Sequence, residues 1–362
     1  MNYSPRRLDA LRQALEQKKA DGIIVSNPHN VRYLSGYTGD DSALLITRDG
    51  GYFYTDFRYT EQAAKEIRGL KLVQRKKSLF NAIAKTVAKR RMKKVLFESA
   101  SVTFQQYQEL TQAVPRSRLV PNWGAVANIR MVKDEGEIRT IQAAARVAET
   151  GFRRFRGMVK TGLDERVMAN GLDFRMRALG AECPAFEIIV AVRERASQPH
   201  ARPTRRILRK GEPVLVDWGA RKDFYNSDLT RVLFTDRIPR TIRRVYEIVR
   251  EAQRLAIAAV GPEVPAKQVD RAARQYIRKH GFGKQFGHGV GHGVGLEVHE
   301  LPTINASSRH ILKPGMVFTV EPGIYLPGVG GVRIEDMVLV TPNGCEVLTA
   351  LPKAIDEMVV PV

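Results

Sequence analysis

Four carboxylates and one imidazole stand in apolar or glycine-rich segments of this chain, where charged side chains are uncommon. The segments read VLVDWG, NSDLTR, GVGHGVG, FTVEPG and GVRIEDM. Buried carboxylates without a counter-charge are costly, so either these acids are protonated or cations lie among them. Two divalent cations would balance four ionised carboxylates. The five residues are Asp217, Asp228, His292, Glu321 and Glu335.

The two aspartates are separated by a polar stretch. Asp217 ends an apolar segment, and Asp228 follows after residues that suit a turn. If the flanking segments pair as a hairpin, both carboxylates reach the same place. Alone this pair is weak evidence, because most aspartates near turns are turn residues or helix N-caps.

The segment 287–300 carries three of the seven histidines, His288, His292 and His299. Its alternating glycines argue against a helix, so His288 and His292 are not the helical pair of a zincin motif. In an extended backbone these two side chains share one face, and the opposite face is bare glycine that lets another element approach closely. His299 has the opposite parity, so a bend near Gly293 or Gly295 is needed if all three rings converge.

The glutamates interrupt apolar runs near the end of the chain. Glu321 precedes a proline and a glycine, and Glu335 lies within VRIEDMVLV. A single glutamate in a strand often faces solvent, so neither residue alone defines a site. Arg333 has the parity of Glu335 and can pair with it or with another nearby acid.

The five residues together form an oxygen-rich ligand set. Such a set suits manganese, cobalt or iron(II) better than a thiolate-type zinc site. Two metals bridged by carboxylates can hold a shared hydroxide at neutral pH and orient it towards a carbonyl. Hydrolysis of an amide is the chemistry that follows.

Two regions are expected to position these residues. The first third of the chain alternates helix-like and strand-like segments, until Val120–Gly124 breaks the pattern. Beyond it the periodicity predicts helices at 134–155, 164–178, 240–260 and 266–280, with Asp164 as an N-cap and strands at FEIIVAV and PVLVDWG. The end of the chain is rich in predicted strands and carries most of the candidate residues.

Length and composition narrow the protein class. The chain has 362 residues, enough for two domains, and 43% of them are hydrophobic, as in folded soluble proteins. No segment suits a membrane span or a secretion signal, so the cytoplasm is the expected location, and Cys183 and Cys345 are expected to be free thiols. The net charge of +21 would attract acidic partners, but the basic residues are dispersed and lack interleaved aromatic residues. This argues against nucleic acid as the main partner.

The same strings, in this order, resemble those of the pita-bread metallopeptidases, the family that contains methionine aminopeptidase, aminopeptidase P, prolidase and the metal-free creatinase. The resemblance covers nearly the whole chain. It implies a fold in which an α+β pita-bread catalytic domain at 125–362 follows a smaller α/β creatinase-like N-terminal domain at 1–124. The segment NVRYLSGYTGDDSALLITRDGGYFYTDFRYTEQA carries the N-terminal part of the resemblance. A homodimer is also implied.

The resemblance assigns roles to single residues. Asp217, Asp228, His292, Glu321 and Glu335 match five ligands of two divalent metal ions, with manganese expected first and cobalt, zinc or iron as alternatives. Asp228 and Glu335 match the bridging ligands, and Glu321 also matches the glutamate that takes a proton from the bridging water. The matches to substrate-binding residues are His200 near the scissile bond, His299 at the tetrahedral intermediate, His288 at the proline pocket and Arg333 beside the metals.

The subfamily follows from the same motifs. GVRIED together with PHA resembles the proline-specific branch, whereas methionine aminopeptidases lack the N-terminal domain and creatinase lacks the full ligand set. The expected activity is that of an Xaa-Pro aminopeptidase, which hydrolyses the bond between an N-terminal residue and proline through a metal-bridging hydroxide. A prolidase restricted to dipeptides is the closest alternative. A non-catalytic binding protein with a basic surface would have lost some of the metal ligands, whereas all five candidate ligands are present in this sequence.

Two departures from the family pattern affect expectations about the substrate. Arg193, Glu194 and Arg195 stand where relatives have small residues, which predicts a more charged substrate mouth. Phe224 stands where a glycine is common in the turn between the two aspartates. Neither change removes a ligand, and the preferred peptide stays open.

Overall fold

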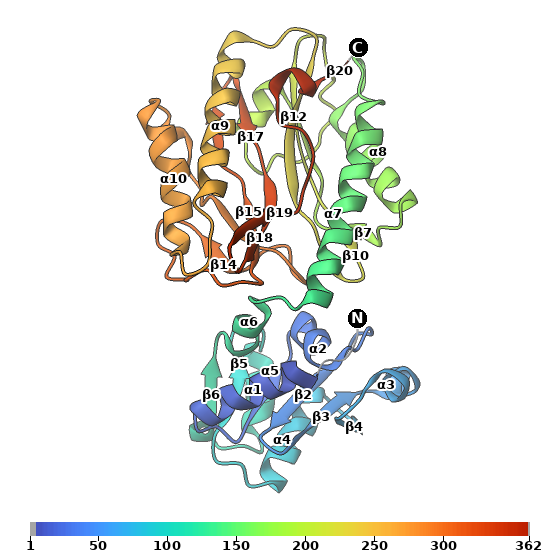
Figure 1. The fold of residues 1–362 in the computed structure, drawn as a ribbon. Coiled ribbons are helices and arrows are strands. Elements are labelled where there is room, and N and C mark those ends of the chain that lie inside the picture. The colour runs from blue at the N-terminus through green and yellow to red at the C-terminus, as the bar shows by residue number, and fades with distance from the viewer. Residues whose placement is uncertain (1–4, 361–362) are drawn as a thin grey trace. The chain divides into compact units, whose positions relative to one another are not determined.

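The computed structural model describes residues 5–360, which form two compact units divided between Arg130 and Met131. The N-terminal unit is built on a six-stranded sheet in the order β4-β3-β2-β1-β5-β6 (Figure 1). Strand β1 pairs antiparallel with β2 and parallel with β5, so the sheet is mixed. Its elements are α1 (Pro5–Gln17), β1 (Gly22–Val25), α2 (Pro28–Ser35), β2 (Ala43–Thr47), β3 (Gly50–Thr55), η1 (Phe57–Tyr59), α3 (Thr60–Glu66), β4 (Lys71–Gln74), α4 (Leu79–Lys89), β5 (Val95–Glu98), α5 (Phe104–Thr111), η2 (Arg116–Arg118), β6 (Leu119–Asn122) and α6 (Ala125–Arg130).

The division between the units lies after the break expected from the sequence. Val120 and Pro121 do not leave the sheet but continue β6, where they pair with Leu96 and Phe97 of β5. A proline is tolerated there because β6 is an edge strand. Helix α6 then contacts α1 and α2, so 125–130 pack with the N-terminal unit, whereas the sequence assigns them to the catalytic domain.

The C-terminal unit consists of small sheets flanked by two helix pairs (Figure 1). Helices α7 and α8 pack together and contact β7, β8, β10 and β11, and α9 and α10 pack together and contact β14 to β17. The helices are α7 (Glu135–Arg156), α8 (Glu165–Ala178), α9 (Arg240–Ala258) and α10 (Ala266–Lys279), with the short turns η3 (Arg193–Ser197), η4 (Gly283–Gln285) and η5 (Ile355–Met358). The strands are β7 (Cys183–Pro184), β8 (Ile189–Val192), β9 (Pro213–Trp218), β10 (Ala220–Lys222), β11 (Tyr225–Asn226), β12 (Leu229–Thr235), β13 (Gly291–Gly293), β14 (Glu300–Ile304), β15 (Val317–Val320), β16 (Gly323–Leu326), β17 (Gly330–Arg333), β18 (Asp336–Thr341), β19 (Gly344–Val347) and β20 (Val359–Val360).

The helix starts follow the capping signals in the sequence. Asp134 caps α7 and forms a capping box with Glu137, and Asp164 caps α8 by accepting from Val167 N. The predicted helices at 134–155, 164–178, 240–260 and 266–280 are all confirmed as α7, α8, α9 and α10.

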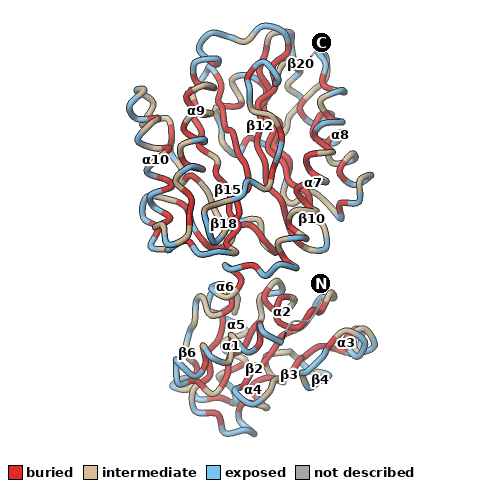
Figure 2. Tube along the Cα trace, viewed as in Figure 1, coloured by how far each residue is buried: buried red, intermediate tan, exposed pale blue. Residues whose placement is uncertain are grey.

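The strands that carry the candidate aspartates lie in the core of the C-terminal unit. Every residue of β9 and β12 is buried, and β12 is labelled within the core of the unit in Figure 2. Trp218, at the end of β9, stacks on Phe152 of α7 with 4.1 Å between ring centroids, and its Nε1 donates to Ala148 O at 3.0 Å. Polar side chains on these two strands are therefore held in an enclosed environment.

The turn between β10 and β11 explains why a glycine is common at the position of Phe224. Asp223 and Phe224 have φ values of 47° and 68°, and two consecutive positive values are typical of a type I′ turn. A side chain in this left-handed conformation costs roughly 1–2 kcal/mol.

Two further observations concern the whole described chain. Cys183 and Cys345 are both free thiols. Among residues 5–360, no helix combines the length and the apolar character that crossing a membrane requires.

Candidate metal centre

Asp217 and Asp228 reach one face of the β9–β12 pair. The strands are antiparallel, with Asp217 opposite Thr230. Asp228 lies two residues before Thr230 and therefore points to the same side as Asp217. The expected hairpin is present, and β10 and β11 form the excursion between its two strands.

His292 belongs to β13, and the glycines on each side of it are required by their surroundings. A Cβ on Gly291 would lie 1.9 Å from Thr319 O, and a Cβ on Gly293 would lie 2.1 Å from Leu301 O. Only a residue without a side chain permits such close approach. The register also shifts between His292 and Gly293, which confirms the expected bend, and the ring of His299 comes to 4.1 Å from that of His292.

Glu321 and Glu335 meet where β15 ends and β18 begins. Val320 pairs with Asp336, so the adjoining Glu321 and Glu335 lie at the same end of this strand pair. Glu335 also forms an isolated bridge with Thr230 of β12, and its N–H donates to Thr230 O at 3.2 Å. This bridge joins the four-stranded and five-stranded sheets and brings the acids of both together.

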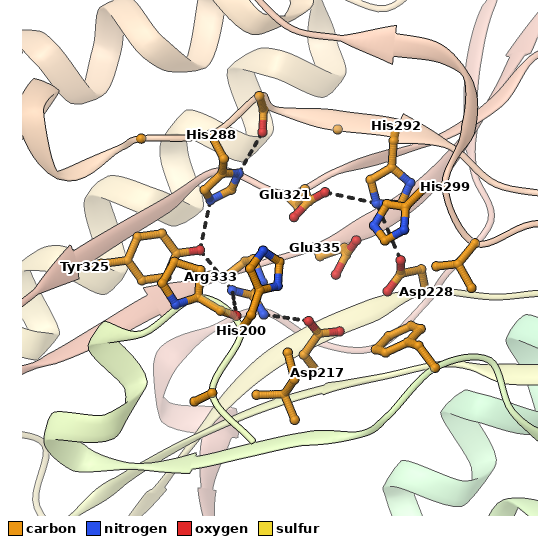
Figure 3. Close-up of a pocket in the computed structure, with 18 of the residues that line it drawn as sticks. His200, Asp217, Asp228, His288, His292, His299, Glu321, Tyr325, Arg333 and Glu335 are labelled. Atoms are coloured by element: carbon orange, nitrogen blue, oxygen red, sulfur yellow. Dashed lines mark hydrogen bonds and ion pairs between the residues drawn. The ribbon is translucent and has the colours of Figure 1, made fainter. Parts of the chain in front are cut away.

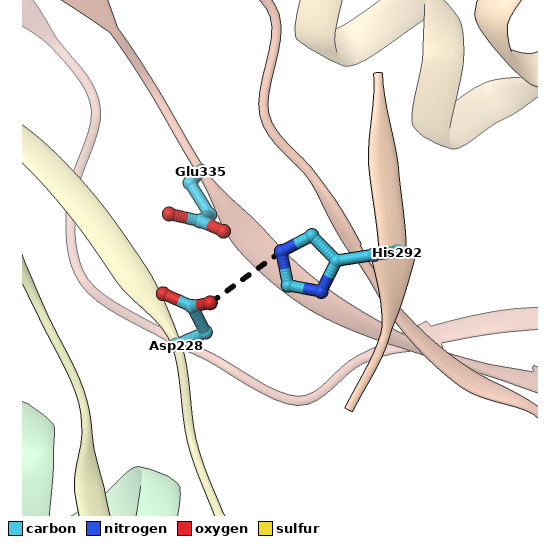
Figure 4. A group of neighbouring side chains, drawn as sticks. All are labelled: Asp228, His292 and Glu335. Atoms are coloured by element: carbon cyan, nitrogen blue, oxygen red, sulfur yellow. Dashed lines mark ion pairs between the residues drawn. The ribbon is translucent and has the colours of Figure 1, made fainter. Parts of the chain in front are cut away.

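Three of the candidate ligands form a group suited to a metal ion. Asp228, His292 and Glu335 each offer one ligand atom, and these atoms lie within 4.8 Å of one another (Figure 4). His292 Nε2 is 3.6 Å from Asp228 Oδ2 and 3.2 Å from Glu321 Oε1. Asp217 Oδ1 is buried and has no hydrogen-bond partner within residues 5–360. The predominance of carboxylate oxygens and this unsatisfied atom fit hard divalent cations.

The electrostatics of the group favour bound cations. Burial, reinforced by the neighbouring carboxylates, raises the pKa of Asp228 and of Glu335 well above their ordinary values. Burial also raises the pKa of Asp217, against the opposing charge of Arg333. For Glu321, burial acts in the same direction, but the hydrogen bond and charge of His292 lower its pKa to about 2. Divalent ions would relieve the repulsion among these acids.

Arg333 pairs with Asp217 rather than with Glu335. Its Nη2 donates to Asp217 Oδ2 at 2.5 Å, and its Nε donates to Thr230 Oγ1 at 3.0 Å. Thr230 Oγ1 in turn donates to Glu335 Oε2 at 2.6 Å. Thr230 therefore links the guanidinium of Arg333 to the carboxylate of Glu335.

Tyr325 is a site residue that the sequence analysis did not find. Its hydroxyl accepts from Arg333 Nη1 at 2.9 Å and lies 2.9 Å from His288 Nε2 (Figure 3). It comes from β16, which pairs with β17 so that Gly323 lies opposite Arg333. The only local signal is its alternation with Gly323, and the pairing with β17 cannot be deduced from that.

The candidate residues line one cavity of about 840 Å³. His200 and His299 are both exposed in it, and His288 lies between Tyr325 and the ring of Phe286. All nine predicted site residues line this cavity: His200, Asp217, Asp228, His288, His292, His299, Glu321, Arg333 and Glu335.

The expectation that 193–195 would charge the substrate mouth is wrong, because these residues do not line the cavity. Arg195 pairs with the fully buried Glu165 at 2.9 Å, and Arg193 approaches Glu212 to 3.7 Å. The charged residues at the cavity's outer part are instead Glu187, Arg202 and Lys284, which the sequence analysis did not single out.

Comparison with known proteins agrees with this geometry. Residues 139–342 match metallopeptidase family M24, and residues 7–132 match the creatinase/prolidase N-terminal domain. The uncharacterized peptidase YqhT of Bacillus subtilis is 38% identical over 96% of this chain and 98% of its own length. The structure of an Xaa-Pro dipeptidase from Bacillus anthracis is 36% identical, with a TM-score of 0.94 over 98% of this chain and 99% of that one. The structure of an X-Pro aminopeptidase from Thermotoga maritima is 34% identical, with a TM-score of 0.86 over 96% and 100%.

These matches confirm the expected fold class, a creatinase-type N-terminal domain followed by a pita-bread catalytic domain. They also show that the chain is a hydrolase of a family that uses divalent metal ions. The chain belongs to metallopeptidase family M24.

Proposed function

We propose that this chain hydrolyses the bond between an N-terminal residue and a following proline, as an Xaa-Pro aminopeptidase or prolidase. The observation that carries the proposal is the convergence of four carboxylates and one imidazole in a single cavity. Similar proteins with solved structures include an Xaa-Pro dipeptidase and an X-Pro aminopeptidase, which supports both forms of the activity.

The proposed metal ligands are Asp217, Asp228, His292, Glu321 and Glu335. Asp228 and Glu335 suit the bridging positions, because burial, reinforced by the surrounding acids, raises the pKa of these two carboxyls well above their ordinary values. When bound, two divalent ions would act as Lewis acids and lower the pKa of water to near neutrality. Manganese is the first candidate, since oxygen ligands predominate.

The proposed roles of the other residues follow from their contacts. In the metal-free chain the hydrogen bond and charge of His292 hold the pKa of Glu321 below its ordinary value, so this carboxylate is ionised at neutral pH; its proposed role as proton acceptor rests on the resemblance. Burial and the charge of His292 lower the pKa of His299, so its neutral ring can donate one N–H to a substrate oxygen. His200 is exposed in the same cavity and can contact the substrate carbonyl.

Proline imposes its own requirement on the cavity. Its nitrogen carries no hydrogen in a peptide, so recognition must rely on the shape of the ring and on neighbouring carbonyl groups. His288 and Tyr325 form an aromatic wall of the cavity, with 5.6 Å between their ring centroids. The buried ring of Phe286 lies outside the cavity lining and packs against His288, with 5.1 Å between centroids. We assign this wall to the proline ring.

The test is cleavage of defined peptides by protein purified without chelator. We expect turnover of Ala-Pro or Ala-Pro-Ala-Ala and none of Ala-Ala, loss of activity after metal removal, and recovery when manganese is added back. Asp223→Asn serves as a control for substitutions of the proposed ligands, because it removes one acid at the exposed tip of the β10–β11 turn, outside the ligand set. Failure of the metal-loaded protein to cleave any Xaa-Pro peptide would refute the proposal.

A homodimer is also proposed, on the resemblance alone, and sedimentation equilibrium tests it. Location in the cytoplasm stays a prediction.

A further inference from the structure

Three cationic side chains line the cavity: Arg202, Lys284 and Arg333. Arg333 is buried against Asp217, and Arg202 Nε lies 3.3 Å from Glu187 Oε2. Lys284 differs from both, because no carboxylate within residues 5–360 forms an ion pair with it. An exposed ammonium without a counter-charge, on the wall of a catalytic cavity, is available to an anionic group of the substrate.

The position of Lys284 relates it to the wall assigned to proline. It lies in η4, which contacts α10 and also β16, the strand of Tyr325. Tyr325 contacts His288 and Arg333, and Arg333 contacts Asp217. A chain of contacts thus runs from the neighbourhood of Lys284 to the candidate metal ligands, along the side expected to hold the leaving group.

The backbone that follows Lys284 is anchored to α10 by Arg274. The guanidinium binds both oxygens of Asp270, at 2.8 and 2.7 Å, and donates to Phe286 O at 3.2 Å and to His288 O at 2.7 Å. Asp270 Oδ1 also accepts from Val290 N at 3.2 Å. The segment is therefore held in place while the Lys284 side chain stays exposed, which limits the conformational entropy lost when a ligand binds.

We infer that Lys284 binds the free C-terminal carboxylate of the substrate and so makes the enzyme prefer short Xaa-Pro peptides that end inside the cavity. This inference rests on the proposed function. An ammonium offers three donors and a compact charge, which suits a carboxylate, whereas an amidated or internal residue offers only a neutral group there. The cavity of about 840 Å³ lies in the upper part of the range for small-ligand sites and accommodates a short peptide.

The experiment compares each peptide acid with its own amide. Ala-Pro and Ala-Pro-Ala, each as free acid and as carboxamide, are assayed with the wild-type protein and with Lys284→Met. We expect the wild type to prefer the acids and the variant to lose about five- to tenfold of that preference in kcat/KM, through KM, as an exposed charge pair would allow. Lys284→Arg should keep most of the preference. Of the two peptides, the one whose acid preference falls more in Lys284→Met has its C-terminal carboxylate nearer to Lys284.

Two matched variants complete the design. Lys279→Met removes an exposed cation near the end of α10 that does not line the cavity, and the preference should stay at the wild-type value. Arg202→Met removes the other cation of the outer cavity. A loss of preference in Arg202→Met instead of Lys284→Met would overturn the inference.

The remaining outcomes separate the inference from the proposed function. Equal changes for acids and amides in Lys284→Met, or no change, would overturn the role of Lys284 while Xaa-Pro cleavage by the wild type upholds the activity. If the wild type cleaves none of these peptides, the proposed function itself fails.

Discussion

Glu335 and Asp336 are neighbours in the sequence, are both buried, and have opposite electrostatic surroundings. Asp336 accepts four hydrogen bonds at 2.7 Å, from Arg231, Thr349, Gln253 and Lys353. Glu335 accepts one such bond, from Thr230, and otherwise faces other acids. Burial raises the pKa of both, but Arg231 and Lys353 bring that of Asp336 below its ordinary value, whereas nearby carboxylates raise that of Glu335 further.

This difference separates a structural acid from a functional one. Successive residues of a strand point to opposite sides, so β12 and the start of β18 present an ion-pair network on one side and the acid cluster on the other. Burial alone does not distinguish the two. The two acids are distinguished by the number of hydrogen-bond donors and cations around each carboxylate. Substitutions at Asp336 and at Glu335 can test this difference.

The largest effect on stability is expected from Asp336→Asn. The change leaves the guanidinium of Arg231, which is fully buried, without its carboxylate, and such a loss costs about 3–5 kcal/mol. Urea unfolding of the metal-free protein measures it. Asp356→Asn is the control, because this acid is 86% exposed and its pair with Arg243 spans 3.6 Å. A loss below about 1 kcal/mol at Asp336, as for a surface pair, would contradict the comparison.

Glu335→Gln is expected to have the reverse profile. Loss of one proposed ligand should reduce metal binding and lower activity by more than about 100-fold, since even outer-sphere changes at metal sites cost 10–100-fold. The free energy of unfolding of the metal-free protein should stay constant or rise, because a crowded carboxylate is replaced by a neutral amide. Elemental analysis, peptide assays and urea unfolding measure the three quantities. Glu335→Ala and Asp228→Ala should also abolish metal binding and turnover, and cleavage retained in either would refute the ligand assignment.

Thr230→Val tests the threonine between the two charged groups. The substitution keeps a β-branched side chain in β12 and removes the hydroxyl that contacts both Glu335 and Arg333. We expect metal affinity or kcat/KM to fall about 10–100-fold. Thr235→Val, at the other end of β12, removes hydrogen bonds to Arg209 O and Glu212 O and should change stability only. Equal activity losses in the two variants would mean that the hydroxyl of Thr230 has no special role.

The smallest effect concerns Glu98, a buried acid of the N-terminal unit. Its Oε2 accepts from Ser26 N at 2.7 Å and from Asn27 N at 2.8 Å, yet burial still raises its pKa above the ordinary 4.5. The folded chain therefore binds this proton more tightly than the unfolded chain, and stability falls as pH rises above 4.5. The stability of Glu98→Gln relative to wild type should increase over that window in urea unfolding. Glu61→Gln, 85% exposed, should show no such trend, and a constant difference for Glu98→Gln would contradict the argument.

Local features of the fold could be predicted from the sequence. Asp134 and Asp164 mark the starts of α7 and α8 because capping depends on residues three positions apart. The hairpin of β9 and β12 and the bend after His292 also follow from patterns within short segments. Residue types and spacing single out eight of the nine candidate residues, and the resemblance adds His200 and the individual roles. The structure brings all nine to one cavity, while their roles stay proposals.

What the sequence could not supply depends on contacts between distant segments. Arg333 could pair with any nearby acid, and only the packing of β17 against β9 selects Asp217. Arg231 and Asp336 meet because β12 and β18 pack together, and these strands are also distant in sequence. No local pattern distinguishes Asp336 from Glu335. The departure from the family pattern at 193–195 predicts a charged substrate mouth, and it cannot show that Arg195 and Arg193 have partners in Glu165 and Glu212, which are distant in sequence.

The tight packing of β13 has a consequence for protein engineering. Even alanine at position 291 would force a methyl group to within 1.9 Å of Thr319 O, so libraries that randomise this strand should consist mostly of unfolded clones. If Lys284 has the role inferred above, selectivity is better redesigned there, because its side chain is exposed and lines the cavity. On these proposals, the chemistry and the specificity of this scaffold lie on separate residues, which can be changed independently.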